Sequence, residues 1–535
     1  MIKEENIPKP LDDNLIDPPI DLHLSLENSL RESFEKIPCS SPNEKIESAK
    51  YVVLGNVDAG KSTFVGVMEK DILDDGRGHA RSLITRFKHE IDRHCTSSHT
   101  PHYLINGNEI TTLIDLCGHE KYFKTTMFGV TGLFCDYGLL IIGGNTSDSD
   151  VNHMTKDHLA LLISNNIPFL VIVTKIDISP EKVAICKRNL NAIAANRNHR
   201  KQIIYFEEEE QCDESGSYLK SSHREIISTF QERATNLMPV IMISNKTGHN
   251  IKFVREFIIG IKSRNYLMRT GCIPKVLDQK TASYPMVMYV DSVFSVQGIG
   301  IVLSGTVKYG VMTLGQKIYI GPVGTEYVLA TIKCMKNCVS ENVSMIAENE
   351  SGSIGLRLDS KGSYSKKTYS KGQIVTTDLE FFRINTCYTF NCTVYIFNHP
   401  TTIRNGYQGI IHCGTIRQAG RFKIEGGMSL RTNHKEVINI KFVSHPEFIL
   451  PGTRFMFRDG KTKGAGLTKG IGLIDHGIPY LLDKPDFNKH SGKFKHTKKV
   501  TEENVGDGSK EGSKVGSMEV SKEIQKEIEK EIEKS

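Results

Sequence analysis

The sequence predicts an α/β P-loop domain followed by two antiparallel β-barrel domains, with flexible N- and C-terminal extensions. Three observations predict this order. A phosphate-binding pattern lies at residues 55–62, and short apolar runs separated by helical patterns continue to about residue 265. From residue 283 the pattern changes to alternating strands broken by glycine turns. Runs that are apolar at nearly every position suit a parallel sheet covered on both faces, whereas alternation suits small antiparallel barrels.

The N-terminal region is rich in charge and proline, so we expect a flexible arm over residues 1–48. It lacks the apolar core of a secretory signal, and the chain has no apolar run approaching the roughly 20 residues that cross a bilayer. The 12 cysteines are scattered without a zinc-binding pattern, which indicates reduced thiols. We therefore expect a cytoplasmic monomer with no membrane partner.

The phosphate-binding pattern at 55–62 reads Gly-Asn-Val-Asp-Ala-Gly-Lys-Ser and fits G-x-x-x-x-G-K-[ST]. It follows the apolar run 51–54 and precedes a helix-like segment, which is the context that the motif requires. Gly55 and Gly60 allow the backbone N–H groups to converge on one anion, assisted by the helix dipole. Lys61 would reach the β- and γ-phosphates, and Ser62 would bind Mg²⁺. An accidental glycine turn is a much poorer interpretation.

The remaining pattern predicts the domain boundaries. The first domain covers 49–265, with predicted strands at 51–54, 110–114, 138–142, 169–173 and 240–243. Two β-barrel domains follow at 283–378 and 384–476. The tail 484–535 is low in apolar residues, which favours disorder. Its last part spaces Val520, Ile524, Ile528 and Ile532 four apart, as expected for a lone exposed helix or a docking helix.

Two segments complete a Mg²⁺ and γ-phosphate site. Asp115 follows the apolar run 110–114, where its carboxylate would hold Mg²⁺ through a water molecule. The N–H of Gly118 would meet the γ-phosphate and so sense its loss. Between the phosphate loop and Asp115, Thr96 is our candidate for the switch threonine whose hydroxyl completes the Mg²⁺ shell, although several serines and threonines lie nearby. The predicted metal ligands are therefore Ser62, Thr96 and Asp115.

Two further segments select the base. The sequence Thr174-Lys175-Ile176-Asp177 follows an apolar run, and a carboxylate there can accept hydrogen bonds from N1–H and the 2-amino group of guanine. Adenine offers no such pair, so the nucleotide is GTP or GDP. Ser244, Asn245 and Lys246 would support the base. The predicted nucleotide-binding set is Gly55, Asn56, Val57, Asp58, Ala59, Gly60, Lys61, Ser62, Thr63, Asp115, Gly118, Thr174, Lys175, Asp177, Ser244, Asn245 and Lys246.

His119 directly follows the γ-phosphate-sensing glycine, where its side chain could position the attacking water. A histidine in a loop is more often simply solvated. If an outside partner must turn it inward, intrinsic hydrolysis is slow and activation large, and Val57 would act as an apolar gate. His119 is the predicted catalytic residue.

These motifs resemble those of the translational GTPases, the class of elongation factor Tu and elongation factor 1-alpha, because His119 stands in an Asp-x-x-Gly-His motif. Within this class the chain is similar to the GTP-binding protein one and two family. The resemblance rests on residues 51–63, 74–81 (DDGRGHAR), 96–98, 118–126, 445–448 and 457–464. It covers about residues 49–476. It implies an α/β P-loop GTPase domain followed by two barrels whose mutual orientation changes between the GTP and GDP states.

The resemblance also implies partners, namely the ribosome and aminoacyl-tRNA or another RNA, with a role in translation, ribosome rescue or RNA turnover. The sequence departs from the family pattern in several places. Thr174 stands where most GTPases have asparagine, which predicts lower nucleotide affinity. The N-terminal portion is short, segment 196–229 resembles a family-variable insertion, and the lysine-rich tail has no counterpart.

Three hypotheses remain. The leading one is a GTP hydrolase of the translation-factor class that acts as a timed switch. The second is a GTP-gated RNA or protein binding module in which hydrolysis is incidental. A GTPase subunit of sulfate activation shares the domain plan, but nothing in the sequence indicates its partner subunit. The net charge of +6 permits an RNA partner without demonstrating one.

Overall fold

The computed structural model describes residues 46–85, 90, 96–145, 153–195, 201–232, 236–269, 284–323, 326–358, 368–398, 402–424, 429–432, 434–458 and 469–479. The predicted tail and most of the predicted N-terminal arm lie outside these ranges. Within them, no helix is both long enough and apolar enough to span a membrane.

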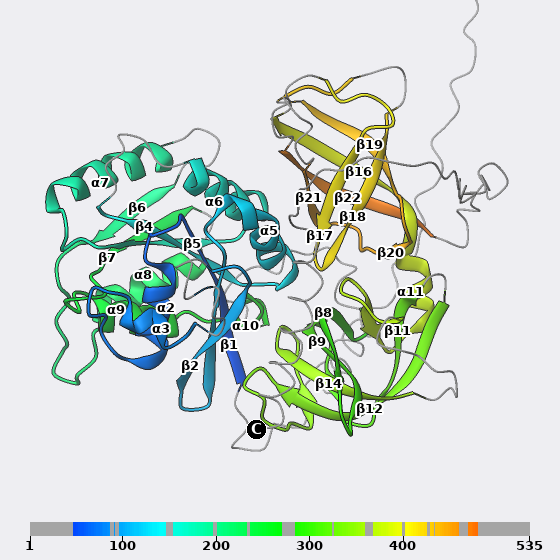
Figure 1. Ribbon diagram of the computed structural model, residues 1–535, viewed down its shortest axis with the longest axis horizontal. Coiled ribbons are helices and arrows are strands. Elements are labelled where there is room, and N and C mark those ends of the chain that lie inside the picture. Colours follow the sequence, from blue (N-terminus) through cyan, green and yellow to red (C-terminus); the bar gives the residue numbers. More distant parts are fainter. Residues whose placement is uncertain are drawn as a thin grey trace, which may run out of the picture. The chain divides into compact units, whose positions relative to one another are not determined.

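The first part of the chain is a seven-stranded sheet in the order β2-β3-β1-β4-β5-β7-β6 (Figure 1). β2 runs antiparallel to β3, and the other neighbouring strands are parallel. The strands are β1 (Ile46–Gly55), β2 (Thr100–Asn106), β3 (Glu109–Asp115), β4 (Tyr137–Gly143), β5 (Phe169–Thr174), β6 (Gln202–Phe206) and β7 (Leu237–Met242). The described helices are α2 (Lys61–Lys70), α3 (His79–Ser82), η1 (Glu120–Tyr122), α5 (Phe123–Gly132), α6 (His153–Ser164), α7 (Pro180–Ala194), α8 (Ser221–Glu232), α9 (Ile251–Gly260) and α10 (Arg264–Arg269).

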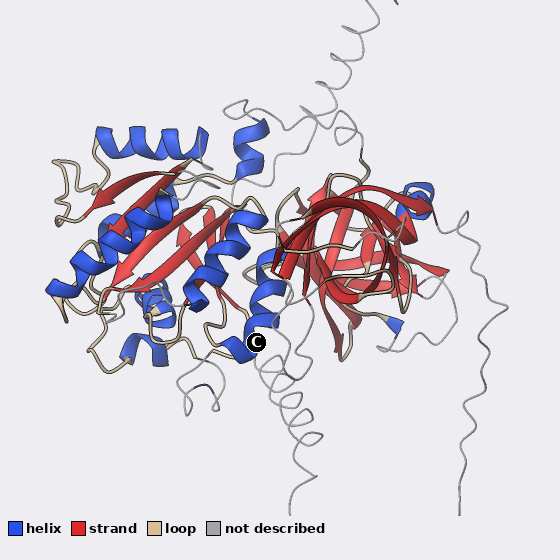
Figure 2. Ribbon diagram, turned by 90° about the horizontal axis from the view of Figure 1, so that it is seen from above, coloured by secondary structure: helices blue, strands red, loops and turns tan. Residues whose placement is uncertain are grey.

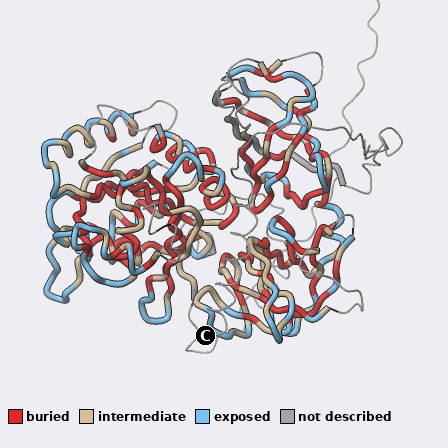
Figure 3. The backbone as a smooth tube through the Cα atoms, viewed as in Figure 1, coloured by how far each residue is buried: buried red, intermediate tan, exposed pale blue. Residues whose placement is uncertain are grey.

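Successive residues of β1 enter two different apolar cores. Tyr51 and Val53 pack in a cluster with residues of α2 and α9, whereas Val52 and Leu54 pack in a cluster with residues of α5 and α6. Helices lie on both sides of the sheet (Figure 2), and the buried backbone is concentrated in its strands (Figure 3). Burial on both faces explains why these strands are apolar at nearly every position. The predicted α/β fold is confirmed.

The segment expected to be a variable insertion is built into this sheet. Its described part supplies β6, which pairs with β7 at the edge, and most of α8. Ile227 and Phe230 of α8 are buried in the core that also contains Tyr51. Removing this segment would therefore open the core.

The second part of the chain is a closed barrel in the order β11-β12-β14-β9-β8-β15. Its strands are β8 (Val287–Val296), β9 (Gly300–Tyr309), β11 (Lys317–Val323), β12 (Glu326–Asn337), β14 (Ser351–Leu358) and β15 (Ile374–Thr376), and β10 (Met312–Thr313) pairs separately with β13 (Met345–Ile346). The alternation seen in the sequence places Met288, Val290 and Leu303 in its core. The predicted first antiparallel barrel is confirmed.

The third part begins with α11 (Leu379–Asn385) and forms an antiparallel sheet in the order β19-β18-β17-β21-β22-β16-β20. Its strands are β16 (Thr386–Asn398), β17 (Gln408–Cys413), β18 (Ile416–Lys423), β19 (Lys435–Phe442), β20 (Glu447–Phe448), β21 (Arg454–Arg458) and β22 (Lys469–Pro479). An additional pairing of β19 with β16 joins the two sides of this sheet around an apolar core.

A buried polar cluster joins the start of β1 to the closed barrel. The Lys50 side chain is almost fully buried, and its ammonium donates to Ser351 Oγ at 2.9 Å and to Thr306 Oγ1 at 3.4 Å. Glu47 lies 3.7 Å from Lys50 Nζ and accepts from Ser351 N at 2.7 Å. β1 starts at Ile46. The flexible arm predicted over 1–48 is therefore too long by three residues, because Glu47 is held by these partners.

A buried histidine, His158 on α6, makes the first domain sensitive to acid. Its ring stacks on Phe123 at 5.9 Å, and in the described structure neither ring nitrogen has a hydrogen-bond partner. Burial, together with the positive charge of Lys61, lowers the pKa of His158 to about 3. The folded state therefore binds fewer protons than the unfolded state below the ordinary histidine pKa, so stability falls as the pH drops from about 6.5 toward 3.

His158→Leu should remove this sensitivity, because leucine cannot take up the proton. Between pH 6.5 and pH 5 the variant should lose about 2 kcal/mol less stability than the wild type. The measurement is the apparent melting temperature as a function of pH, with the exposed His434→Leu as the matched control. Parallel pH profiles for the wild type and His158→Leu would show that His158 does not titrate as described.

Candidate nucleotide-binding site

The phosphate loop is shaped by two glycines between β1 and α2. Gly55 has a φ of 150°, and a Cβ there would lie 2.2 Å from the carbonyl oxygen of Ile141 on β4. Gly60 has a φ of 82° and precedes the first residue of α2. Any other residue at these positions would clash or be strained. The loop thus curls at the carboxyl ends of the parallel strands, with the helix N-terminus behind it.

Strand register brings the predicted metal ligands to this loop. Asp115 ends β3 opposite Val53 of β1 and Thr100 of β2. Its Oδ2 accepts from Ser62 Oγ at 2.6 Å and from Thr96 Oγ1 at 3.2 Å, and the two hydroxyl oxygens are 3.0 Å apart. Three residues that are distant in sequence therefore meet at one carboxylate.

These side chains fit a bound Mg²⁺. Asp115 is buried, and within the described structure its Oδ1 has no hydrogen-bond partner. A buried carboxylate oxygen without a partner is costly, which indicates that another group completes it. Carboxylate and hydroxyl oxygens are ligands that Mg²⁺ accepts. The cluster could therefore hold the metal that accompanies a nucleoside triphosphate.

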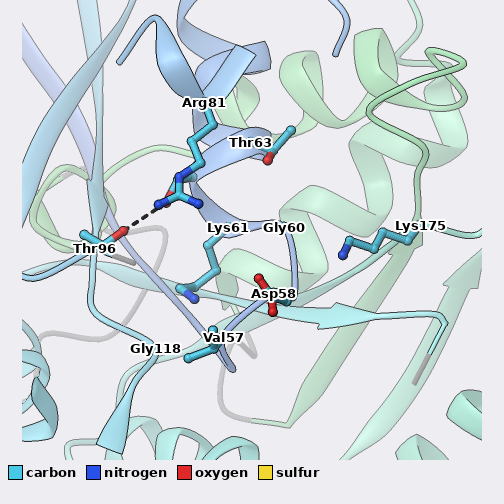
Figure 4. A pocket seen from close by; sticks show the side chains of 10 residues that line it. Val57, Asp58, Gly60, Lys61, Thr63, Arg81, Thr96, Gly118 and Lys175 are labelled. Carbon is cyan, nitrogen blue, oxygen red and sulfur yellow. Dashed lines mark hydrogen bonds between the residues drawn. The ribbon is translucent and has the colours of Figure 1, made fainter. Parts of the chain in front are cut away.

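Gly118, the predicted γ-phosphate sensor, lies against the phosphate-loop lysine. Lys61 is buried, and its Nζ donates to Asn56 O at 2.8 Å. A Cβ on Gly118 would lie 2.4 Å from Lys61 Nζ and 2.7 Å from Gly55 O. Only glycine allows the loop after β3 to approach this closely. Both residues line a cavity of about 100 Å³ (Figure 4), together with Val57, Asp58, Gly60, Ser62, Thr63, Arg81, Thr96 and Lys175.

The predicted base-binding residues converge from two strand ends. Ser244 Oγ donates to Asp177 Oδ1 at 2.7 Å. The Asp177 side chain is exposed, and its other carboxylate oxygen takes no part in this bond. Asn245 is buried, and in the described structure its Oδ1 has no partner. Lys175 has a φ of 58° and reaches the cavity. Lys246 runs beside Gly76 in the segment after α2.

Thr174, which stands where most GTPases have asparagine, still contacts the phosphate loop. Its hydroxyl donates to the carbonyl oxygen of Ala59 at 2.6 Å, so β5 remains tied to the phosphate loop. A Cβ on Gly60 would lie 3.4 Å from this hydroxyl, which shows how closely the loop packs on Thr174.

His119 is not among the residues that line the cavity. It is exposed, its Nδ1 accepts from Lys121 N at 3.1 Å, and it thereby caps η1. Its ring lies 6.3 Å from that of Tyr122. Val57, the predicted gate, is in contrast among the cavity-lining residues. The residue predicted to be catalytic is therefore not assembled with the phosphate site in this arrangement.

Arg81 is a cavity-lining residue that the sequence analysis did not assign to the site. It lies in α3, within the glycine-rich segment 74–81 that was used only for the resemblance. A basic residue close to two glycines after a phosphate-loop helix was the available signal. Its placement depends on how α3 packs on α2, which the sequence does not show.

The comparisons with known proteins agree with this geometry. The family model "Elongation factor Tu GTP binding domain" matches residues 47–288. GTP-binding protein 1 of Xenopus laevis is 29% identical over 467 residues, covering 82% of this chain and 65% of that protein. Elongation factor 1-alpha of Saccharolobus solfataricus is 22% identical over 460 residues, covering 78% of this chain and 95% of that protein.

A solved structure shares the fold. The S. cerevisiae Ski7 GTPase-like domain bound to GTP aligns with a TM-score of 0.57 and 16% identity, covering 83% of this chain and 98% of that one. Residues 47–288 thus match a GTP-binding domain of the elongation factor Tu type, in agreement with the predicted GTPase class. The chain spans about 65% of the length of GTP-binding protein 1.

Thr174→Val should weaken nucleotide binding while preserving the shape of the side chain. The substitution removes the donor to Ala59 O, and a lost buried hydrogen bond of this kind costs about 1 kcal/mol. Kd values for GDP and for a non-hydrolysable GTP analogue should therefore both rise about fivefold. Thr174→Ser keeps the hydroxyl and is the matched control. Equal Kd values for the valine and serine variants would contradict this role.

Proposed function

We propose that this protein binds GTP with Mg²⁺ and hydrolyses it to GDP and phosphate as a conformational switch in translation. Its proposed partners are the ribosome and an aminoacyl-tRNA or another RNA, and we expect it to act as a cytoplasmic monomer. The observation that carries the proposal is that the hydroxyls of Ser62 and Thr96 both meet the Asp115 carboxylate beside the phosphate loop. The names of relatives such as elongation factor 1-alpha support the link to translation.

The reaction needs stabilisation of negative charge more than covalent help from the protein. Water attacks the γ-phosphorus, the bond to the β-phosphate oxygen breaks, and GDP leaves with the electron pair. Lys61 and the phosphate-loop N–H groups would balance charge on the phosphate oxygens, and bound Mg²⁺ would supply further positive charge. Asp177 would select guanine. In this arrangement, Gly118 N–H would lose its partner when phosphate departs.

A route from that loop to the third part of the chain supports the switch. Gly118 precedes η1 and α5, and α5 packs against the third part. Thr131 Oγ1 on α5 donates to Gly414 O at 3.3 Å, and the Arg458 guanidinium lies 4.8 Å from the centre of the Phe123 ring. A shift of α5 after phosphate release would disturb these contacts. The contacts between α5 and the third part would therefore depend on whether GTP or GDP is bound.

His119 would enter the reaction only after reorientation. Its ring would have to leave the Lys121 backbone N–H and turn past Val57 toward the phosphates. Hydrolysis would then depend on a partner that stabilises the inward rotamer of His119. The binding energy of this partner would shift the rotamer population toward the inward form. Intrinsic turnover would therefore be slow, as a timed switch requires.

The exposed position of His119 also favours a second candidate function, a GTP-gated binding module with incidental hydrolysis. Such a module needs Asp115, Gly118 and the α5 contacts, but it does not need an inward-facing histidine. Both functions share GTP binding and a role beside RNA or ribosomal partners. They differ in whether a partner accelerates hydrolysis through His119.

The test is the rate of GTP hydrolysis with and without ribosomes, for the wild type and for His119→Ala. Ribosomes should accelerate the wild type strongly, and the alanine variant should lose about a hundredfold or more of the stimulated rate. GTP binding by the variant should be unchanged, because His119 lies outside the cavity. His434→Ala is the matched control, since His434 is exposed on the third part of the chain.

Absence of ribosomal acceleration in the wild type, with GTP still bound, would reject the timed switch and favour the binding module. Stimulation that survives in His119→Ala would keep the switch but remove His119 from it.

A further inference from the structure

Residues 74–82 form a compact support for Arg81 beside the phosphate loop. The Asp74 carboxylate accepts from the backbone N–H groups of Gly76 at 2.9 Å, Gly78 at 3.3 Å and Ala80 at 3.0 Å. Asp74 N itself donates to Asn245 O at 2.9 Å, next to the base-binding residues. The segment is therefore tied to the nucleotide site at its start and folded around one buried carboxylate.

α3 then packs on the helix that follows the phosphate loop. A Cβ on Gly66 of α2 would lie 2.2 Å from Ala80 O, so the two backbones touch at this glycine. Arg81 is the next residue along α3. Its backbone is thus fixed relative to Ser62 and Thr63 at the start of α2 by direct packing.

The Arg81 side chain lines the same cavity as Ser62 and Thr96 (Figure 4). It lines the same cavity as Lys61 and is partly buried. Its Nη2 donates to Glu90 O at 3.3 Å, and within the described ranges it forms no ion pair with a carboxylate. A guanidinium has five donors, so most of its hydrogen-bonding capacity is available to an anion in the cavity.

Glu90 links the same arginine to the predicted switch threonine. Its side chain is buried, and its Oε1 accepts from both the backbone N–H and the hydroxyl of Ser97 at 2.7 Å. Ser97 directly follows Thr96. The chain of contacts from Arg81 through Glu90 to Ser97 therefore holds Thr96 at the Asp115 carboxylate.

We propose that Arg81 is a γ-phosphate-binding residue supplied from within the chain, and that it couples this phosphate to the position of Thr96. The inference rests on the proposed GTP-binding function and deepens it. Arg81 lines the same cavity as Ser62 and Thr96, whose hydroxyls meet at the Asp115 carboxylate. A Mg²⁺ ion held by Ser62, Thr96 and Asp115 would bring the phosphates of GTP to this cavity, where Arg81 would bind the γ-phosphate.

The charges favour this assignment over a purely structural arginine. A neutral donor could make the hydrogen bond to Glu90 O equally well. That bond therefore does not explain why position 81 carries a positive charge. Guanidinium groups bind phosphate with two parallel hydrogen bonds, and charge-assisted bonds of this kind are about twice as strong as neutral ones. GDP lacks the γ-phosphate, so Arg81 would distinguish the two nucleotides.

The experiment measures Kd for GDP and for a non-hydrolysable GTP analogue at constant Mg²⁺, using the full chain. Arg81→Gln should weaken binding of the GTP analogue at least about tenfold, as expected for a lost charge-assisted hydrogen bond, and should leave GDP binding within about threefold. Arg77→Gln removes the same charge from an exposed position four residues earlier and should change neither Kd.

Glu90→Gln and Arg81→Lys test the coupling. Glu90→Gln keeps Glu90 O for Arg81 but weakens the hold on Ser97, so it should also reduce affinity for the GTP analogue more than for GDP. Arg81→Lys keeps the positive charge but lacks the planar guanidinium group. Its Kd for the GTP analogue should therefore lie between those of the wild type and Arg81→Gln. If Arg81→Gln does not fold, the Kd values of Arg81→Lys still test whether Arg81 binds the γ-phosphate.

Equal losses for both nucleotides, or no loss for either, in Arg81→Gln and Arg81→Lys would overturn the inference. Either result would leave the proposed function intact as long as the wild type binds guanine nucleotides. A wild type that binds neither nucleotide would instead reject the proposed function itself.

Discussion

The Asp115 carboxylate is the contact on which the rest of the site depends. One of its oxygens holds the hydroxyls of Ser62 and Thr96, while the other is buried without a partner in the described structure. These contacts draw the phosphate loop and the segment before β2 to the end of β3. A buried charge of this kind is stable only with compensating ligands. The arrangement therefore fits the cation and the phosphates of the proposed function.

The sheet places that carboxylate, and the two other parts of the chain contact the domain that contains the sheet. Burial of β1 on both faces fixes the strand register, and the register puts Asp115 beside the loop. At its start, β1 is held to the closed barrel by Lys50 and Glu47. At the other side, α5 contacts the third part through Thr131. The candidate nucleotide site therefore belongs to a domain with two such connections, a buried one at the start of β1 and one on α5, which follows Gly118 in the chain.

Much of the fold and of the candidate site was predictable because the local sequence motifs themselves place residues of the required chemistry at the ends of predicted strands. The strand before the loop, the glycines at 55 and 60, and Asp115 after an apolar run follow from spacing alone. The structure places Thr96 beside Ser62, although several hydroxyl residues competed for that prediction. Three features depend on tertiary packing and could not be predicted. They are the approach of Arg81 through Gly66, the bond from Thr174 to the loop, and the outward position of His119.

The most direct test of the Asp115 site is the dissociation rate of a fluorescent GTP analogue with Mg²⁺ and with a chelator. Chelation should accelerate release from the wild type at least about tenfold, because each charge-assisted contact contributes more than about 1.4 kcal/mol. Ser62→Ala should release the analogue quickly under both conditions. Identical release rates from the wild type with and without Mg²⁺ would show that Ser62, Thr96 and Asp115 do not hold a metal, and would contradict the proposed site.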